Sequence, residues 1–496
     1  MEAVAILRYS PRPGRSRLAR LGDWMARHRR AILALQWAVV AFYVLLVALP
    51  AFLPHPNPEA RLFSSDLGAS SFVDPNFCAA APGDAAAPHD KAPYVAGWRE
   101  RLVLLAQYLF WGIWWPFVIL SVMFLGRVWC GVLCPEGALS EFASRHGRAN
   151  AIPRWLRWSG WPAVAFVLTT IYGQLISVYE YPQAALLILG GSTLAAMLIG
   201  YLYGRGKRVW CRYLCPVTGV FALLARLAPL HFRVDRDAWR THAQRTGAVD
   251  CAPLLPVSHL QGMAECHACG RCSGHRGAVE LAWRPFAAET LAGPPPATAE
   301  ALLLIFGLLG VAMGAFQWTV SPWFVRAKQL AAAWLLDRDI AWPLDTDAPW
   351  WLLTHAPAAG DLFSWLDGAL ILAYILAVAL VLGGAIWLAV AAAARLAGLD
   401  WRRLALGLTP LAGIGLFLGL SMMTANFLRA EGMTLSWLAH LRAVLLFLGA
   451  VWSGWLGLRL VASAGPGIGR RTLALAAWLA PVAAVVASWA LVFNFW

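Results

Sequence analysis

The sequence predicts an all-α fold, a polytopic membrane helical bundle of about nine spans. The 496 residues are 60% hydrophobic and only 13% charged, which is too apolar for a soluble protein of this length. The apolar residues form runs of about 20, the length that a helix needs to cross a bilayer. The net charge of +14 comes from arginines that flank these runs instead of forming one basic domain. We therefore expect the lipid bilayer as a partner and no nucleic acid.

Nine apolar segments are long enough to be predicted as membrane spans. The first follows an arginine-rich N-terminus and is too long for the apolar part of a signal peptide, so we expect a retained helix. The fifth is short, and the sixth is long enough to tilt or to extend past the bilayer. The nine segments are 31–53, 102–125, 160–178, 184–203, 301–320, 362–394, 404–426, 441–462 and 472–494.

The arginines alternate between loops in a way that predicts the orientation of the chain. Arginine-rich loops normally stay in the cytoplasm, and here they predict an N-in, C-out topology in a bacterial inner membrane. Proline-, aspartate- and tryptophan-rich loops fall on the periplasmic side. Four cations on that side, Arg326, Lys328, Arg429 and Arg442, weaken the pattern without reversing it.

Four regions follow from these segments. We expect a basic cytoplasmic N-terminus at 1–30 and a membrane core at 31–230. A cytoplasmic loop follows at 231–297, and a C-terminal membrane domain with a periplasmic loop at 321–361 occupies 298–496. The cytoplasmic loop is the part of the chain in which cysteines are densest.

Eight of the nine cysteines form three sets, all predicted on the cytoplasmic side. That compartment is reducing, which disfavours disulfides and favours metal ligation. Two sets are repeats, Cys130 with Cys134 in WCGVLCP and Cys211 with Cys215 in WCRYLCP. The Cys-x3-Cys spacing predicts two thiols one helical turn apart on one face. Cys78 stands alone, and we assign it no role.

The third set has the spacing of a ferredoxin. Cys266, Cys269 and Cys272 are each separated by two residues, like the first three ligands of a cubane cluster. The expected fourth cysteine is replaced by Arg276, and Cys251 is the nearest substitute. His267 is expected to be a neighbour of the cluster or an exposed residue and not a ligand.

Eight thiolates are enough for two [4Fe–4S] clusters. The working assignment places one cluster on Cys130, Cys134, Cys211 and Cys215 and the other on Cys251, Cys266, Cys269 and Cys272. Crossed ligation, in which Cys134 or Cys215 completes the second cluster, stays open. Zinc is the competing metal, because four thiolates also suit it.

These motifs resemble the NosR/NapH-type membrane polyferredoxins over residues 102–284. The resemblance implies [4Fe–4S] clusters on the cytoplasmic side that exchange electrons between the quinol pool and periplasmic systems. The chain departs from NosR in having one Cys-x2-Cys-x2-Cys run and no flavin-attachment motif. Its C-terminal spans are more similar to the FtrD-like polyferredoxin subunit of periplasmic ferrous-iron uptake systems.

The resulting hypothesis is a membrane-bound [4Fe–4S] electron carrier. It would link the clusters or the quinone pool to a periplasmic redox partner, and in the iron-uptake version an iron permease would be a further partner. The alternatives are a quinol-linked donor to a periplasmic reductase, and a transporter or maturation factor with a structural metal site. The sequence shows no obvious cofactor bridging the two membrane faces, so a bound quinone is the candidate for that role.

Overall fold

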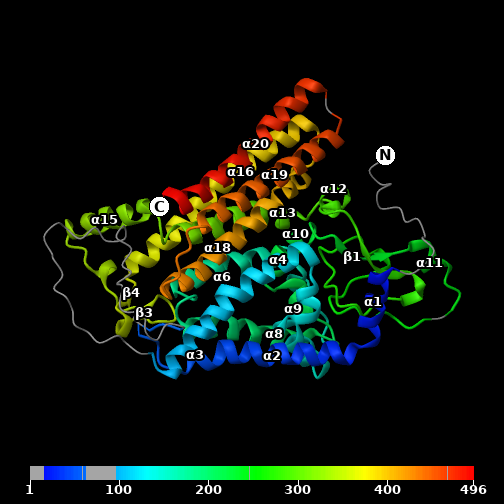
Figure 1. Ribbon diagram of the computed structural model, residues 1–496, viewed down its shortest axis with the longest axis horizontal. Helices are drawn as coiled ribbons and strands as arrows, with labels where there is room; N and C mark the ends of the chain where they lie inside the picture. Colours follow the sequence, from blue (N-terminus) through cyan, green and yellow to red (C-terminus); the bar gives the residue numbers. More distant parts are fainter. Residues whose placement is uncertain (1–15, 58–59, 63–95, 245, 466, 496) are drawn as a thin grey trace.

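The computed structural model describes residues 16–57, 60–62, 96–244, 246–465 and 467–495. It confirms the all-α class, because helices make up most of these residues and the strands are four short ones in two pairs. Figure 1 shows long helices running along the molecule, with α1, α11 and β1 gathered at one end and α15, β3 and β4 at the other. We call these the loop end and the hairpin end.

Eight of the described helices are long and apolar enough to cross a membrane. Each matches a predicted span to within a few residues at either end. They are Arg29–Ala51, Trp98–Leu125, Pro182–Tyr203, Thr298–Gln317, Trp365–Ala397, Trp401–Ala430, Leu438–Ser463 and Ile468–Phe495.

The predicted third span differs from the others. It contains α6, Trp161–Leu175, whose 15 residues extend over about 22 Å, less than the roughly 30 Å of a hydrocarbon core. Proline at the start of α6 and a left-handed Ser177 just after its end limit the helix. Its C-terminal residue Leu175 accepts a hydrogen bond from the Thr354 N–H, which places that end of α6 beside the β3–β4 pair.

The first half of the chain contains two similar helical units. In the first, α2 (Arg29–Ala51) is followed by a long helix made of α3 (Trp98–Gln107), η2 (Tyr108–Trp114) and α4 (Trp115–Leu125). In the second, α6 is followed by α7 (Pro182–Ala185), η5 (Leu186–Gly190) and α8 (Gly191–Tyr203). The segments η2 and η5 are π-helical turns inside these helices, a feature that often marks functional positions.

Short helices at the loop end carry the cysteine repeats. They are η3 (Trp129–Leu133) and α5 (Pro135–Arg145) for the first repeat and α9 (Val209–Tyr213) and α10 (Thr218–Ala225) for the second; the short helix η4 (Trp155–Arg157) lies between the two in sequence.

An antiparallel strand pair closes the cysteine-rich loop region. Strand β1 (Leu230–Val234) pairs with β2 (Val279–Trp283), so that Leu230 faces Trp283 and Val234 faces Val279. The N-terminal helix α1 (Arg17–Arg27) packs on β2, and the Ser273 hydroxyl donates to the Asp23 carboxylate. The remaining short helices here are α11 (Arg236–Thr241), η6 (Val257–His259), η7 (His275–Gly277) and α12 (Ala288–Ala292).

The C-terminal half is a bundle of four long helical segments that packs against a fifth segment. The fifth combines α13 (Thr298–Leu302), η8 (Leu303–Val311) and α14 (Ala312–Gln317). The four are α16 (Trp365–Ala397), α17 (Trp401–Ala405) continued by η11 (Leu406–Leu408) and α18 (Thr409–Ala430), α19 (Leu438–Ser463), and α20 (Ile468–Ala490) with η12 (Leu491–Phe495). The hairpin end carries α15 (Pro322–Leu336), η9 (Trp342–Leu344), β3 (His355–Ala356), η10 (Pro357–Ala359) and β4 (Asp361–Leu362).

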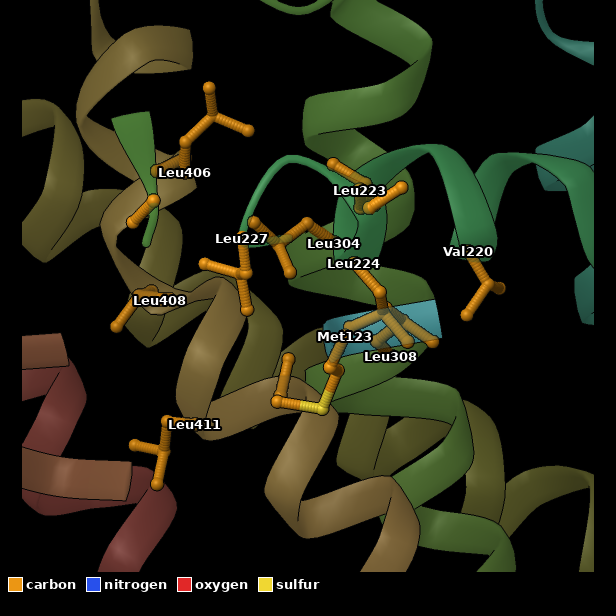
Figure 2. Close-up of a cluster of buried hydrophobic side chains, with 14 of the residues drawn as sticks. Met123, Val220, Leu223, Leu224, Leu227, Leu304, Leu308, Leu406, Leu408 and Leu411 are labelled. Carbon is orange, nitrogen blue, oxygen red and sulfur yellow. The ribbon is translucent and has the colours of Figure 1, made fainter. Parts of the chain in front are cut away.

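One apolar core joins the two halves. Figure 2 shows Met123 of α4, Leu224 of α10 and Leu308 of η8 close together in it, with Leu411 of α18 farther along the same buried cluster. Close-packed interiors of this kind resist relative movement of their elements. The C-terminal helices therefore support the short helices α4 and α10 that flank the cysteine motifs.

Candidate metal centre

The first cysteine repeat lies at a helix-to-helix junction. Cys130 is inside η3, and Cys134 follows as the N-cap of α5, with Pro135 as the first residue of that helix. The Cys134 Sγ accepts the N–H of Gly137 at 3.4 Å. The positive end of the α5 dipole therefore points at this sulfur, which favours its thiolate form.

The second repeat also lies at a junction between two short helices. Cys211 is inside α9, and Cys215 lies in the turn before α10. The Cys134 N–H donates to the Trp129 carbonyl at 2.9 Å, and the Cys215 N–H donates to the Trp210 carbonyl at 3.0 Å. In each repeat the first cysteine is helical and the second follows the end of its helix.

The four cysteines of the two repeats line a single cavity of about 180 Å³. Burial raises the pKa of Cys134 and Cys215 well above the usual range and that of Cys211 to about 12, with the neighbouring thiols adding to the shift. Removing these protons therefore needs a strong counter-charge, and an iron cluster supplies one.

The other four cysteines line a second, smaller cavity of about 20 Å³. Burial raises the pKa of Cys266 well above its usual range, that of Cys272 to about 12, and that of Cys251 to a smaller extent. The Cys266 Sγ accepts the Ala268 N–H at 3.4 Å. Left-handed backbone at Ala268 and Gly270 turns the chain between the cysteines.

The two sets of cysteines meet at Gly131. A Cβ built on Gly131 would lie 2.0 Å from the His267 carbonyl oxygen and 2.8 Å from the Cys269 nitrogen, so only glycine fits there. The Gln36 side-chain amide from α2 donates to the Gly131 carbonyl at 2.8 Å. The corresponding residue of the second repeat is Arg212, which pairs with Glu265 at 2.9 Å.

An arginine next to each repeat makes hydrogen bonds to the other repeat. Arg127, three residues before Cys130, donates to the Thr218 hydroxyl in the second repeat and to the Ala264 carbonyl at 2.7 Å. Arg208, three residues before Cys211, donates to the Cys130 carbonyl in the first repeat. Both arginines are buried, so these contacts cross between the repeats without water.

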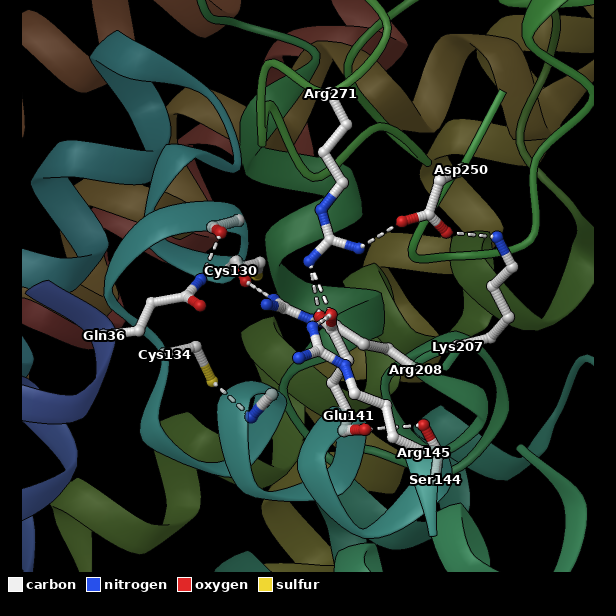
Figure 3. Close-up of polar contacts among 12 residues, drawn as sticks. Gln36, Cys130, Cys134, Glu141, Ser144, Arg145, Lys207, Arg208, Asp250 and Arg271 are labelled. Atoms are coloured by element: carbon white, nitrogen blue, oxygen red, sulfur yellow. Dashed lines mark hydrogen bonds and ion pairs between the residues drawn. The ribbon is translucent and has the colours of Figure 1, made fainter. Parts of the chain in front are cut away.

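Glu141 balances the charge of the buried arginines. Figure 3 shows Arg208, Arg271 and Arg145 pointing at its carboxylate, with N–O distances of 3.0, 2.6 and 2.5 Å. Burial alone would raise the pKa of Glu141, but Arg208 and Arg271 lower it to about 2. Arg271 also contacts Asp250, whose carboxylate pairs with Lys207 at 2.6 Å and Arg29 at 2.9 Å.

A buried donor near the thiols has no partner. The Arg208 Nη2 is buried without a hydrogen-bond acceptor among the described residues, and its charge interacts with Cys211, Cys269 and Cys134. Cluster sulfides and cysteine sulfurs accept hydrogen bonds of this kind. The set of cysteine thiols and this unpartnered Nη2 donor of Arg208 therefore fit an iron–sulfur cluster.

The structure brings together all eight predicted cysteines, in two cavities that follow the working assignment. Within the described ranges, no three His, Cys, Asp or Glu side chains are placed to hold a single metal ion. The cysteine thiols instead line the two cavities described above. His267 is 2% exposed, so it is a buried neighbour of the cysteines and not a surface residue. Cys78 lies outside the described residues.

Sequence reasoning missed Glu141, Arg271, Gly131 and Gln36. Arg271 stands inside CHACGRC, and its position among cysteines was the available signal. Gln36 carries no local signal, because its partner is distant in sequence, and the only local signal for Glu141 is its i,i+4 pair with Arg145.

The family profile of the 4Fe-4S binding domain matches residues 108–158 and 186–235, which contain the two cysteine repeats. YccM of Escherichia coli K12, named as a candidate electron transport protein, is 27% identical over 183 residues, 32% of this chain and 50% of YccM. The regulatory protein NosR of Pseudomonas aeruginosa is 29% identical over 197 residues, 36% of this chain and 27% of NosR. Over the matched residues the chain is similar to the NosR/NapH-type membrane ferredoxins.

A further relative is the protein NirI of Paracoccus denitrificans, 29% identical over 156 residues, which are 27% of this chain and 22% of NirI. The chain spans half or less of the length of each of these relatives. No solved structure matches it significantly. The likeness thus identifies an iron–sulfur core in a multi-pass membrane protein and leaves the C-terminal helices outside the matched ranges.

Proposed function

We propose that this protein is an electron carrier of the bacterial inner membrane with two [4Fe–4S] clusters. Cys130, Cys134, Cys211 and Cys215 would hold the first cluster, and Cys251 with the three cysteines of CHACGRC the second. The observation that carries the proposal is that cysteines from two separate repeats line one cavity beside the second set. When bound, each cluster stores or releases one electron.

The residues of the chain have separate parts in this proposal. The thiolates bind the clusters, and the buried Arg127 and Arg208 offset their negative charge. Glu141 pairs with Arg208 and Arg271 and so keeps these two positive charges between the two sets of cysteines. The apolar packing around α4 and α10 excludes water, which strengthens these electrostatic interactions.

For the physiological role we propose electron acceptance from a periplasmic redox protein during ferrous-iron uptake, with an iron permease in the same system. Each Fe²⁺ oxidised to Fe³⁺ releases one electron, and one cluster accepts it. This version rests on the expected similarity of the C-terminal helices, which lie beyond the matched ranges, to the FtrD-like subunit. A quinone would carry the electron between the membrane faces. The alternative is a quinol-linked donor to a periplasmic reductase.

The test is the metal content of protein purified without oxygen. We expect about eight irons and eight acid-labile sulfides per chain, and an EPR signal on reduction. Cys130→Ser and Cys266→Ser should each lower iron to about four, because each removes a ligand from a different cluster. Cys78→Ser, the matched control, should keep about eight.

Zinc in place of iron would contradict the proposal and favour a transporter or maturation factor with a structural metal site. Unchanged iron in Cys130→Ser would contradict the ligand assignment. Deleting the gene separates the two pathways: loss of ferrous-iron uptake supports the first, and loss of respiratory growth with normal iron uptake supports the second.

A further inference from the structure

A patch of positive charge lies on the surface of the loop end, where two of the long apolar helices have their ends. Its members are Arg29 at the start of α2, Arg145 at the end of α5, Arg148 just beyond it, and Arg205 and Lys207 after the end of α8. Figure 1 shows α2 and α8 along one edge of the molecule, and α5 packs on both. We call these five residues the basic patch.

Contacts between the segments make the basic patch one surface. The Arg148 N–H donates to the Tyr201 carbonyl of α8 at 2.8 Å, which joins the loop after α5 to the end of α8. The side chains of Arg29 and Lys207 meet at the Asp250 carboxylate, at 2.9 and 2.6 Å. Cations from three separate parts of the chain are therefore held close together.

The basic patch carries more positive charge than the acids around it neutralise. Asp250 pairs with two of its members and is partly exposed. Glu141 pairs with Arg145, but it is buried and shared with two buried arginines. Neither Arg148 nor Arg205 pairs with a carboxylate among the described residues, and both are exposed. The patch is therefore complementary to an anion.

The protein surface beside the basic patch is apolar. Phe142 of α5 and Trp37 of α2 are 44% and 39% exposed, and their rings make an edge-to-face contact with centroids 5.4 Å apart. On α8, Leu194, Leu198 and Tyr201 are exposed at spacings of four and three residues, so they form one face that leads to the patch.

This combination of charge and apolar surface fits a lipid better than a soluble partner. Both α2 and α8 are long and apolar enough to cross a membrane, so their ends lie at the level of the lipid headgroups. Basic sites between membrane helices bind anionic headgroups. An acidic soluble protein would use the cations alone, whereas a phospholipid uses the cations and the apolar surface together.

We propose that the basic patch binds the phosphate headgroup of an anionic phospholipid, with its acyl chains against the exposed faces of α5 and α8. Arg148 and Arg205 supply the cations that no carboxylate of the described chain pairs with. The headgroup would lie near Asp250, the residue before Cys251, and so would hold the cysteine-rich loop to the bilayer. The inference goes beyond the proposed function and does not depend on which metal the cysteines bind.

The experiment counts the lipids bound to the full chain, purified without oxygen in a neutral detergent, by native mass spectrometry. Each Lys or Arg beside an anionic headgroup contributes about fivefold in affinity, so dioleoyl-phosphatidylglycerol should bind at least about tenfold more tightly than dioleoyl-phosphatidylcholine. The double substitution Arg148→Gln with Arg205→Gln should weaken phosphatidylglycerol binding about ten- to thirtyfold and leave phosphatidylcholine binding unchanged.

The matched control is Arg470→Gln with Arg471→Gln. It removes two exposed arginines from the start of another membrane helix, α20, outside the basic patch. This control should bind both lipids like the wild type, and thermal unfolding of each variant checks that the fold is intact.

Weaker phosphatidylglycerol binding in the patch variant alone supports the proposal. Equal affinity of the wild type for the two lipids, or equal losses in the two double variants, overturns it. Binding of glycerol 1-phosphate as tight as that of the lipid would also overturn it, because the patch would then be a site for free phosphate esters. Tight binding of poly-glutamate without a lipid preference would assign the patch to an acidic protein instead.

Discussion

Glu141 is the residue on which the charge balance of the centre depends. Its side chain is 4% exposed and pairs with four arginines, of which Arg208 and Arg271 make close contacts and are themselves buried or nearly so. A buried cation that loses its partner keeps its desolvation cost without the Coulombic gain. The stability of this region should therefore respond strongly to one amide substitution.

We predict that Glu141→Gln lowers the free energy of unfolding by about 3 kcal/mol, because it leaves Arg208 and Arg271 buried without a full counter-charge. The measurement is thermal unfolding in detergent at pH 7. Glu265→Gln is the control: that carboxylate is 58% exposed and pairs with Arg212, so the change should be about 0.5 kcal/mol or less. Equal effects of the two substitutions would contradict the prediction.

The same carboxylate predicts a pH dependence. Its pKa is about 2 in the folded protein and near the ordinary 4.5 when unfolded, so its contribution is fully present above about pH 4.5 and is lost as pH falls toward 2. The difference in melting temperature between wild type and Glu141→Gln should shrink over that window. Comparing the two proteins at each pH cancels other acid effects, and a constant difference would refute the assignment.

At the scale of elements, the contact between η3 and the CHACGRC loop requires a glycine, which has no side chain, at position 131. The backbone of His267 approaches Gly131 so closely that a methyl group cannot fit between them. Backbone atoms cannot rotate away as side chains do, so any substitution must separate the two segments.

We expect Gly131→Ala to lower the iron content, because the displaced loop carries three of the cysteines proposed to hold the second cluster. Gly191→Ala is the matched control: Gly191 begins α8 with φ near −60°, and a Cβ there meets nothing within 4 Å. That control should keep its iron and lose no stability. Iron per chain and thermal unfolding measure both variants, and normal iron in Gly131→Ala would contradict the proposed contact.

The sequence predicted the elements better than their contacts. The spacing and the length of the apolar runs predicted the eight long helices, because both can be recognised within a single stretch of the sequence. The same signals overextended α6, because the apolar run continues past Leu175 into a turn that Ser177 makes in the left-handed region. The cysteine spacings predicted the two sets, but the approach of Gly131 to His267 joins segments too distant for any spacing rule.

At the scale of the whole molecule, the helices connect two ends of different chemistry. In Figure 1 α1 and β1 lie at the loop end, whereas the C-terminus lies toward the hairpin end with α15. If α6 counts as a crossing, the chain passes through the bundle nine times. The arginine distribution then predicts that the loop end faces the cytoplasm.

Reporter fusions test this orientation. Alkaline phosphatase, active only in the periplasm, should be active when fused after Phe495 and inactive when fused within residues 242–248. A cytoplasmic fluorescent reporter should give the opposite pattern at both sites. Matching activity at the two sites would contradict the N-in, C-out arrangement.

The exchange of arginines between the repeats has a consequence for how the protein is made. Arg127 emerges from the ribosome long before Thr218 and Ala264, the groups that it must contact. The first two cysteines therefore have no second pair to complete a four-thiol site until the later repeat has been synthesised. Iron delivery must then be a late, post-insertion step, timed by completion of the polypeptide through CHACGRC and not by synthesis of either motif alone.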